Sequence, residues 1–77
     1  KVFSYFKKIG VAAVEITNDG LIVGDKILIM GSITNFEQEI ESMQVEGNDI
    51  EEISAGKSVG LKVTEDVQVG DFVYKLI

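Results

Sequence analysis

Short strand-like segments, separated by turns rich in Gly, Asn and Asp, limit this chain to very few folds. β-branched, aromatic or other apolar residues are frequent in these segments, and in several of them the apolar side chains fall on one strand face. The expected strands cover residues 2–6, 11–16, 26–30, 36–45, 59–63 and 72–77. Six strands at turn spacings of roughly 8–12 residues predict an all-β fold with a closed or nearly closed barrel. With 77 residues, the chain is expected to form a single domain over residues 1–77.

The longest expected strand, residues 36–45, changes phase in its middle. Glu37, Glu39 and Glu41 occupy alternate positions, whereas the apolar residues of the second half are out of step with those of the first. One extra residue would return the strand to the same buried face, so we expect a β-bulge near Glu41 and Ser42. A helix is the competing interpretation, because the apolar residues also have spacings of four and three. The Gly-bounded neighbouring segments favour the strand.

The sequence V-G-D occurs twice, at residues 23–25 and 69–71, each time directly before an expected strand. Gly adopts backbone angles that other residues resist, and an Asp carboxylate can accept hydrogen bonds from turn amides. We therefore interpret Gly24 and Asp25, and likewise Gly70 and Asp71, as two equivalent corners of one barrel rather than as catalytic groups. Gly56 is interpreted as a further turn glycine.

The composition removes most catalytic and metal-binding chemistry. The chain has no Cys and no His, which excludes disulfides, thiolate nucleophiles, imidazole bases and zinc sites built on either residue. The sequence A-G-K-S at residues 55–58 ends like a phosphate-binding loop, but the glycine that such a loop requires is replaced by Glu51. We expect no enzyme activity, no cofactor and no metal.

No apolar run could span a bilayer, so a cytoplasmic protein is expected. Because the chain begins at Lys1 without Met, we also expect that a few natural N-terminal residues are missing.

The net charge of -6 disfavours contact with long nucleic acids. We therefore expect no binding to duplex DNA and no membrane association. The same charge favours a basic protein partner, and it leaves open a local site for an RNA end on a less acidic face.

Two groups of residues are candidates for binding. Aromatic residues beside lysines can stack on bases while the lysines contact phosphates, although Phe3 and Tyr5 are expected on one strand face and Phe6 on the other, so that one face belongs to the core. The alternate glutamates would form a solvated strand face or a protein-docking surface. The candidate RNA-binding residues are Phe3, Tyr5, Lys7, Lys8, Lys57 and Lys62, and the candidate docking residues are Glu37, Glu39 and Glu41.

Several segments together resemble a known family. They are G-V-A-A-V-E-I, L-I-V-G-D-K-I-L-I-M-G, E-S-M-Q-V, I-E-E-I-S-A-G-K-S-V-G-L-K-V and V-Q-V-G-D-F-V-Y-K. In this order they resemble the second domain of translation GTPases such as elongation factor Tu, and most of all the small stand-alone elongation-factor-like proteins of archaea and some bacteria. Related barrels are also appended to collagenase-like peptidases.

The resemblance implies a small closed six-stranded Greek-key β-barrel of the translation-protein type. Its framework residues would be Gly24, Asp25, Gly56, Gly60, Gly70 and Asp71. Lys57 departs from the acidic residue usual in the family, and the absence of the GTPase domain means that GTP hydrolysis is not inherited. The implied function is a non-catalytic module that binds a tRNA or rRNA end or a translation component. The alternative is an acidic protein-interaction module, for example the detached accessory barrel of a larger enzyme such as a collagenase-like peptidase. The oligomeric state is left open.

Overall fold

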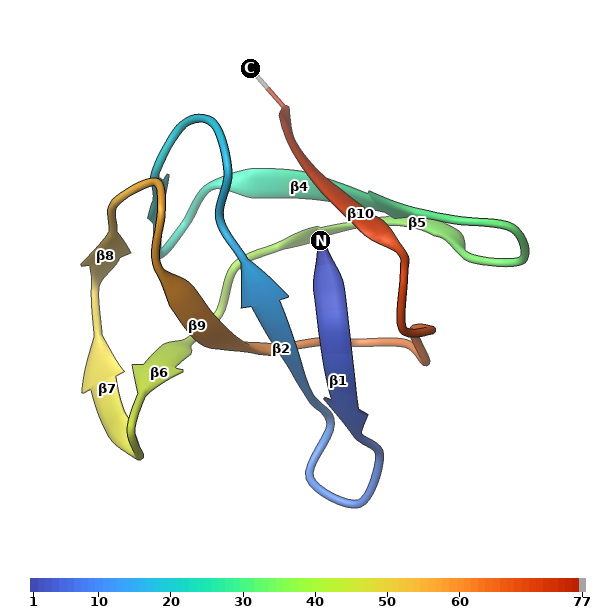
Figure 1. Ribbon diagram of the computed structural model, residues 1–77, viewed down its shortest axis with the longest axis horizontal. Coiled ribbons are helices and arrows are strands. Elements are labelled where there is room, and N and C mark those ends of the chain that lie inside the picture. Colours follow the sequence, from blue (N-terminus) through green and yellow to red (C-terminus); the bar gives the residue numbers. More distant parts are fainter. Residues whose placement is uncertain (77) are drawn as a thin grey trace.

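The computed structural model describes residues 1–76, and within that range it is all strand, with no helix (Figure 1). This confirms the all-β prediction. It also confirms the expected strands at residues 2–6 and 26–30, whereas the last residue of the expected strand 72–77 lies outside the described range. The strands are β1 (Val2–Phe6), β2 (Val11–Glu15), β3 (Leu21–Ile22), β4 (Lys26–Met30), β5 (Asn35–Glu39), β6 (Met43–Val45), β7 (Asn48–Ile50), β8 (Glu52–Ile53), β9 (Ser58–Lys62) and β10 (Phe72–Leu76).

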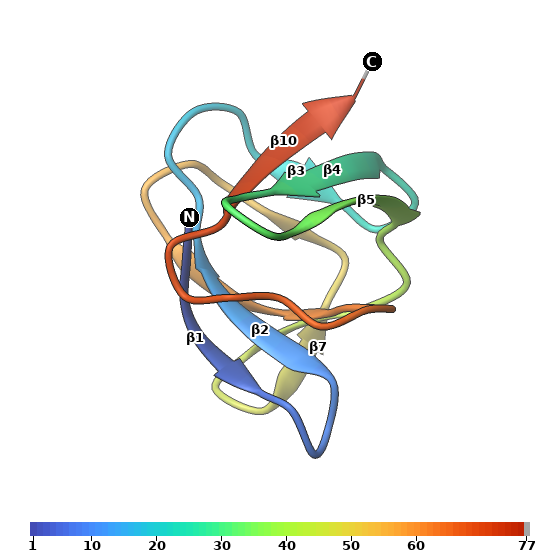
Figure 2. The ribbon, with the colours of Figure 1, turned by 90° about the vertical axis from the view of Figure 1, so that its right-hand side faces the viewer.

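The strands form three antiparallel sheets, ordered β1-β2-β9-β6-β7, β10-β4-β5 and β3-β8. Figure 2 shows the three-stranded sheet lying over β1 and β2 of the five-stranded sheet. None of these sheets closes on itself, so the closed six-stranded Greek-key barrel is not confirmed. Pairs of backbone hydrogen bonds connect the sheets. The Val2 amide donates to the Asp71 carbonyl and the Gly70 amide donates to the Val2 carbonyl, both at 2.8 Å. The Gly24 amide donates to the Ile40 carbonyl (2.9 Å), and the Ile40 amide donates to the Asp25 carbonyl (2.8 Å).

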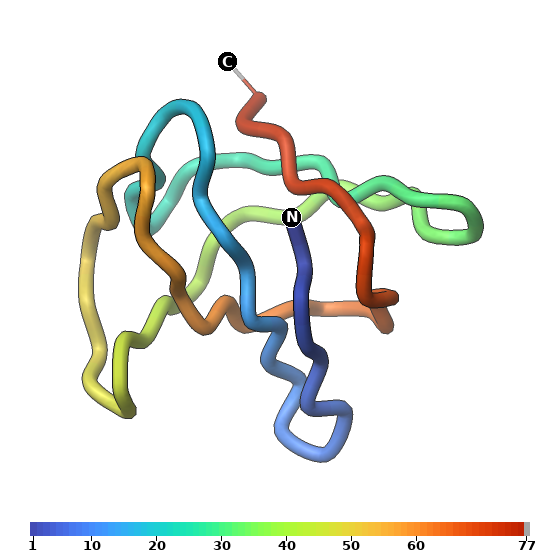
Figure 3. Tube along the Cα trace, in the orientation of Figure 1, coloured from blue at the N-terminus to red at the C-terminus, as the bar shows by residue number. Residues whose placement is uncertain are grey.

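The segment expected as one strand over residues 36–45 is two strands in different sheets. The chain leaves the three-stranded sheet after Glu39 and joins the five-stranded sheet at Met43, a path that can be followed in Figure 3. The expected β-bulge near residues 41 and 42 is therefore wrong, because a change of sheet accounts for the change of phase. Ile40 and Met43 both reach the core, at 1% and 0% exposure. β3, β7 and β8 were not predicted, because they are too short to show an alternating pattern.

A bulge does occur in β1, where the pairing with β2 shifts between Val2 and Ser4. The extra residue turns Tyr5 inward, so that it pairs with Ala12 and packs against the core, while Phe3 stays 53% exposed. The expected common face for Phe3 and Tyr5 is therefore wrong.

The core lies between the sheets and is built from the alternate positions of their strands. Each fully buried aliphatic side chain stabilises the fold by roughly 1.5–3 kcal/mol relative to an exposed one. The side chains with no exposed surface are Ala12 of β2, Ile27 and Ile29 of β4, Met43 of β6 and Leu61 of β9.

One polar side chain, Gln38 of β5, is buried beside this core at 7% exposure. Its Nε2 donates to the Lys62 carbonyl (2.9 Å), and its Oε1 accepts from the Thr64 amide (2.9 Å). Both ends of the amide are thus satisfied, and β5 is connected to the chain that leaves β9. Such a buried amide holds two segments in one register.

Replacing Gln38 with alanine is expected to lower the free energy of unfolding by about 1–2 kcal/mol, because the Thr64 amide loses its acceptor. Gln44 provides the control: its Nε2 donates to Asp49 (3.1 Å) at the surface, so Gln44→Ala should change stability by less than about 0.5 kcal/mol. Urea unfolding of both variants measures the difference. Equal effects of the two substitutions would show that the buried amide has no special role.

The two V-G-D sequences form turns with the same hydrogen bonds. The Asp25 amide donates to the Ile22 carbonyl (2.9 Å), and the Asp71 amide donates to the Gln68 carbonyl (3.0 Å). Each carboxylate accepts from the amide three residues earlier, at 3.0 Å in the first turn and 2.7 Å in the second. Gly24 and Gly70 have φ values of 102° and 99°, as a type II turn requires at its third position.

In the part of the chain that the structure describes, there is no helix long and apolar enough to cross a membrane. The cytoplasmic location stays a prediction.

Candidate functional site

Three of the four lysines that were considered for RNA binding lie at or beside the turn of the β1–β2 hairpin. Lys7 and Lys8 lie in its turn, and Lys62 of β9 donates from Nζ to the Ile9 carbonyl (2.8 Å). The fold therefore brings these three lysines to one end of the five-stranded sheet. The side chains of Phe6 and Ile9 are 52% and 60% exposed beside them.

An acidic residue that the sequence analysis did not consider, Asp66, also lies at this hairpin. Its Oδ1 accepts from the Tyr5 hydroxyl (2.7 Å), and its Oδ2 lies 3.6 Å from Nζ of Lys7. The hydrogen bond from Tyr5, aided by the charge of Lys7, lowers the pKa of Asp66, and the same hydrogen bond raises the pKa of Tyr5. The Tyr5 ring is thus held in place and Lys7 is partly neutralised, which leaves Lys8 as the less restrained cation.

These pKa shifts predict how the hairpin responds to acid. A carboxyl group whose pKa is lowered by folding stabilises the fold above its unfolded pKa, and this contribution is lost as the pH falls through the lowered folded pKa. In Tyr5→Phe the pKa of Asp66 should therefore rise toward its unfolded value, so that the part of the acid-dependent fall in melting temperature due to Asp66 becomes smaller and ends at higher pH. Carbon NMR titration of the Asp66 carboxyl checks this, and an unchanged pKa would contradict the role of the hydrogen bond.

The remaining RNA candidates lie apart from this hairpin. Lys57 precedes β9 at the end where Ser58 pairs with Glu15, whereas Lys62 pairs with Val11 at the other end. A strand of this length separates the two lysines by roughly 16 Å. Phe3 lies on the outer side of β1. The structure thus groups Lys7, Lys8 and Lys62 but not Lys57, and the site for an RNA end stays a prediction.

The three glutamates considered for docking are also divided. Glu37 and Glu39 are exposed on the outer side of β5, opposite Leu28 and Lys26 of β4. Glu41 follows the strand and lines a groove of about 490 Å³ on the five-stranded sheet, together with Ser42, Gln44 and Lys62. The change of sheet after Glu39 separates them, so no single stripe of three glutamates exists.

A second group of exposed apolar side chains, which we call the end surface, was not predicted from the sequence. It combines the outer face of β10 and β4 with the two turns next to them, and its residues are Met30, Ile33, Val69, Phe72 and Tyr74. Ile33 and Val69 are 79% and 67% exposed. They line one shallow groove of about 320 Å³ together with Asp71. Apolar residues placed inside turns were the sequence signal that could have revealed this surface.

The cross-strand register brings the strand residues of the end surface together. Phe72 lies opposite Met30, and Tyr74 lies opposite Leu28. The rings of Phe72 and Tyr74 are 6.2 Å apart between centroids. These contacts place adjacent aromatic rings on the outer face, where Nζ of Lys1 lies 5.5 Å from the centroid of the Phe72 ring.

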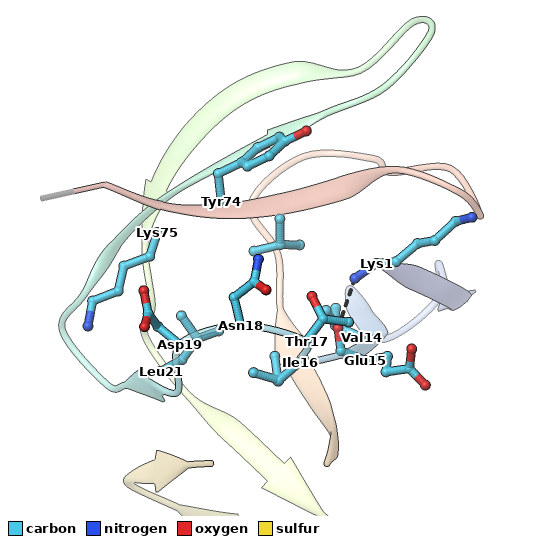
Figure 4. Close-up of a pocket in the computed structure, with 11 residues that line it drawn as sticks. Lys1, Val14, Glu15, Ile16, Thr17, Asn18, Asp19, Leu21, Tyr74 and Lys75 are labelled. Carbon is cyan, nitrogen blue, oxygen red and sulfur yellow. Dashed lines mark hydrogen bonds between the residues drawn. The ribbon is translucent and has the colours of Figure 1, made fainter. Parts of the chain in front are cut away.

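A small pocket lies on the other side of β10, between that strand and residues 17–19 (Figure 4). Figure 4 shows Lys75 on the pocket side and Tyr74 directed away from it. Lys75 lies 3.5 Å from Asp25, and the N-terminal amine donates to the Glu15 carbonyl at its rim (2.8 Å). The volume of about 210 Å³ is below the range of roughly 300–1,000 Å³ typical of ligand sites. Nowhere in residues 1–76 are three or more His, Cys, Asp or Glu side chains grouped so as to hold a metal ion.

By structure, the chain is similar to the C-terminal domain of a Geobacillus thermoleovorans protein described as a U32 peptidase. The TM-score is 0.90 at 26% identity, over 99% of this chain and 88% of that domain. A selenomethionine variant of the same domain matches with a TM-score of 0.87 at 27% identity, over 96% of this chain and 93% of that chain. The class of molecule is therefore a small all-β domain like those at the C-terminus of U32 peptidases.

By sequence, the chain is similar to part of an uncharacterized protease of Methanocaldococcus jannaschii, with 40% identity over 77 residues. It is also 33% identical over 76 residues to a collagenase of Porphyromonas gingivalis. These matches cover 99% and 97% of this chain but only 19% and 21% of the relatives. The chain thus spans about a fifth of the length of the curated relatives. No protein-family profile matches it.

The resemblance to the second domain of translation elongation factors is wrong, because these matches are to U32 peptidase C-terminal domains and to a protease and collagenases. The description as translation-factor-like is wrong for the same reason. The residues that carried the resemblance include the V-G-D turns and other glycines. Such residues specify turn geometry, which unrelated small β domains share, and they therefore do not identify a family.

Proposed function

We propose that the chain is a non-catalytic accessory domain of a U32-type, collagenase-like peptidase. The observation that carries the proposal is the extent of the matches: nearly the whole chain aligns with about a fifth of a protease or a collagenase. The solved counterpart is a C-terminal domain crystallised by itself. A unit of this kind folds on its own and leaves peptide-bond cleavage to the rest of the protein.

The chemistry of the surface supports this assignment. Cleavage of a peptide bond needs a nucleophile or an activated water, with groups that position and stabilise it. This chain has no Cys or His. Its exposed carboxylates at Glu37 and Glu39 lie on β5, Glu41 lies in the connection to β6, and Asp25 and Asp71 are held in turns. The exposed apolar side chains are instead suited to binding another protein surface.

Collagen hydrolysis tests this proposal. The samples are the isolated chain, the intact P. gingivalis collagenase and that collagenase without the segment that this chain matches. We expect the isolated chain to release no peptides from collagen or gelatin, and we expect the deletion to lower collagen hydrolysis at least tenfold. Peptide release by the isolated chain, or full activity after the deletion, would contradict the proposal.

A further inference from the structure

We propose that the end surface is the face through which this domain packs on the peptidase part of a U32-type protein. The inference rests on the proposed function and adds the surface and its partner. The partner expected from the chemistry is a protein surface with an apolar centre and a rim rich in Lys and Arg.

The first support is the composition of the end surface. Its five side chains include two aromatic rings and a methionine, which are residue types enriched at the centres of protein interfaces. It also contains Ile33 and Val69, which are among the most exposed large apolar side chains described. Both belong to turns, so their exposure follows from neither the core nor the strand alternation. In Figure 1 both turns lie on the same side of the molecule, which Figure 2 views face on.

The second support is the rigidity of this face. The turn that carries Val69 is held by Asp71, which is 2% exposed and whose carboxylate accepts from the Gln68 amide at 2.7 Å. Asp71 also contacts Gly31 in the hairpin of Ile33, so closely that a Cβ at Gly31 would collide with its Oδ1. The two turns therefore pack directly against one another, and a surface that is already assembled loses less entropy when a partner binds.

The third support is the charge around the end surface. Across the three-stranded sheet, Tyr74, Leu28 and Glu37 lie side by side, and Leu76, Lys26 and Glu39 form the next row. The β5 side of the surface thus carries two exposed carboxylates, with Lys26 beside Glu39, whereas Lys1 lies over the Phe72 ring of β10. A basic rim on the partner complements them and orients the approach of the two surfaces.

The same charge argues against a second copy as the partner. Each copy has a net charge of -6, so a symmetric pair would bring acidic chains together. The alternative apolar surface, at the β1–β2 hairpin, is less suited to a dry interface because Lys7, Lys8 and Asp66 lie among its apolar side chains.

Titration calorimetry tests the inference with the chain added to the P. gingivalis collagenase that lacks the matched segment. The double variant Ile33→Glu and Val69→Glu places charges at the centre of the end surface, and its affinity is expected to fall at least tenfold. Its circular dichroism and melting temperature should change little, because both side chains are exposed. Ile9→Glu, on the hairpin, is the matched control and should change affinity less than about twofold.

The acidic edge of the end surface, formed by two glutamates of β5, is tested by the double variant Glu37→Lys and Glu39→Lys. This variant should weaken binding and reduce the dependence of affinity on salt, as expected when complementary charges are reversed.

The outcomes separate the inference from the proposed function. If the chain binds and the Ile33, Val69 variant binds equally well, the end surface is not the interface and the proposed function stands. If the collagenase's own segment binds but this chain does not, the proposed function fails. If neither binds, docking on the peptidase part is overturned. Light scattering that shows a dimer disrupted by the double variant would assign the end surface to a second copy and overturn the inference.

Discussion

Replacing Leu61 with alanine is expected to lower the free energy of unfolding by about 2–5 kcal/mol. Leu61 has no exposed surface, and in the five-stranded sheet it pairs with Ala12 on one side and Met43 on the other. Truncation removes the buried side chain and leaves a cavity that strands fixed by hydrogen bonds on both sides cannot close. In a domain of this size such a loss is a large part of the total stability.

Urea unfolding at constant temperature measures this effect, and the melting temperature should fall by at least about 8 °C. Ile33→Ala is the control, since its side chain is 79% exposed and its removal should cost less than about 0.5 kcal/mol. A loss of less than about 1 kcal/mol for Leu61→Ala would show that the two sheets do not enclose this side chain.

The second large effect is expected for Asp71→Ala, which should lower the free energy of unfolding by about 2–3 kcal/mol. Asp71 is 2% exposed, and its carboxylate accepts from the Gln68 amide at 2.7 Å while it packs against Gly31. Alanine would leave that amide without its acceptor and open a gap between the two turns of the end surface. Because the Asp71 carbonyl also accepts from Val2, the disturbance should extend to β1.

Asp25→Ala is the matched control for this prediction, because Asp25 makes the same turn contact with Ile22 at 3.0 Å but its side chain is 23% exposed. Water can replace the lost contact there, and the nearby Lys75 is a partly exposed partner worth little. The expected loss is about 1 kcal/mol or less. Equal losses in the two variants would contradict the importance of burial at Asp71.

The sequence predicted the strands where a regular pattern extends over several residues. In β4, Ile27 and Ile29 alternate with less buried neighbours over five residues, and the expected bounds agree with the structure. The change of sheet after Glu39 was not predictable in this way. A bulge and a change of sheet both shift the alternation by one residue, and only the pairing partners of Met43 distinguish them.

The candidate site was harder to predict because its residues are distant in the sequence. The pairing of Tyr5 with Asp66 spans 61 positions, and no local pattern connects them. The end surface likewise depends on Ile33 and Val69, which only the tertiary fold brings to one groove. The V-G-D turns were visible because a positive φ at Gly and a carboxylate contact three residues back are local properties.

The central claim is that this chain serves as the accessory domain of a U32-type peptidase. The most direct measurement is collagen hydrolysis by a P. gingivalis collagenase in which this chain replaces the matched segment, compared with the deletion variant and the intact enzyme. We expect the chimera to regain most of the collagen hydrolysis that is lost on deletion. The double variant Ile33→Glu and Val69→Glu should abolish this recovery. A soluble, folded chimera that is no more active than the deletion variant would contradict the claim.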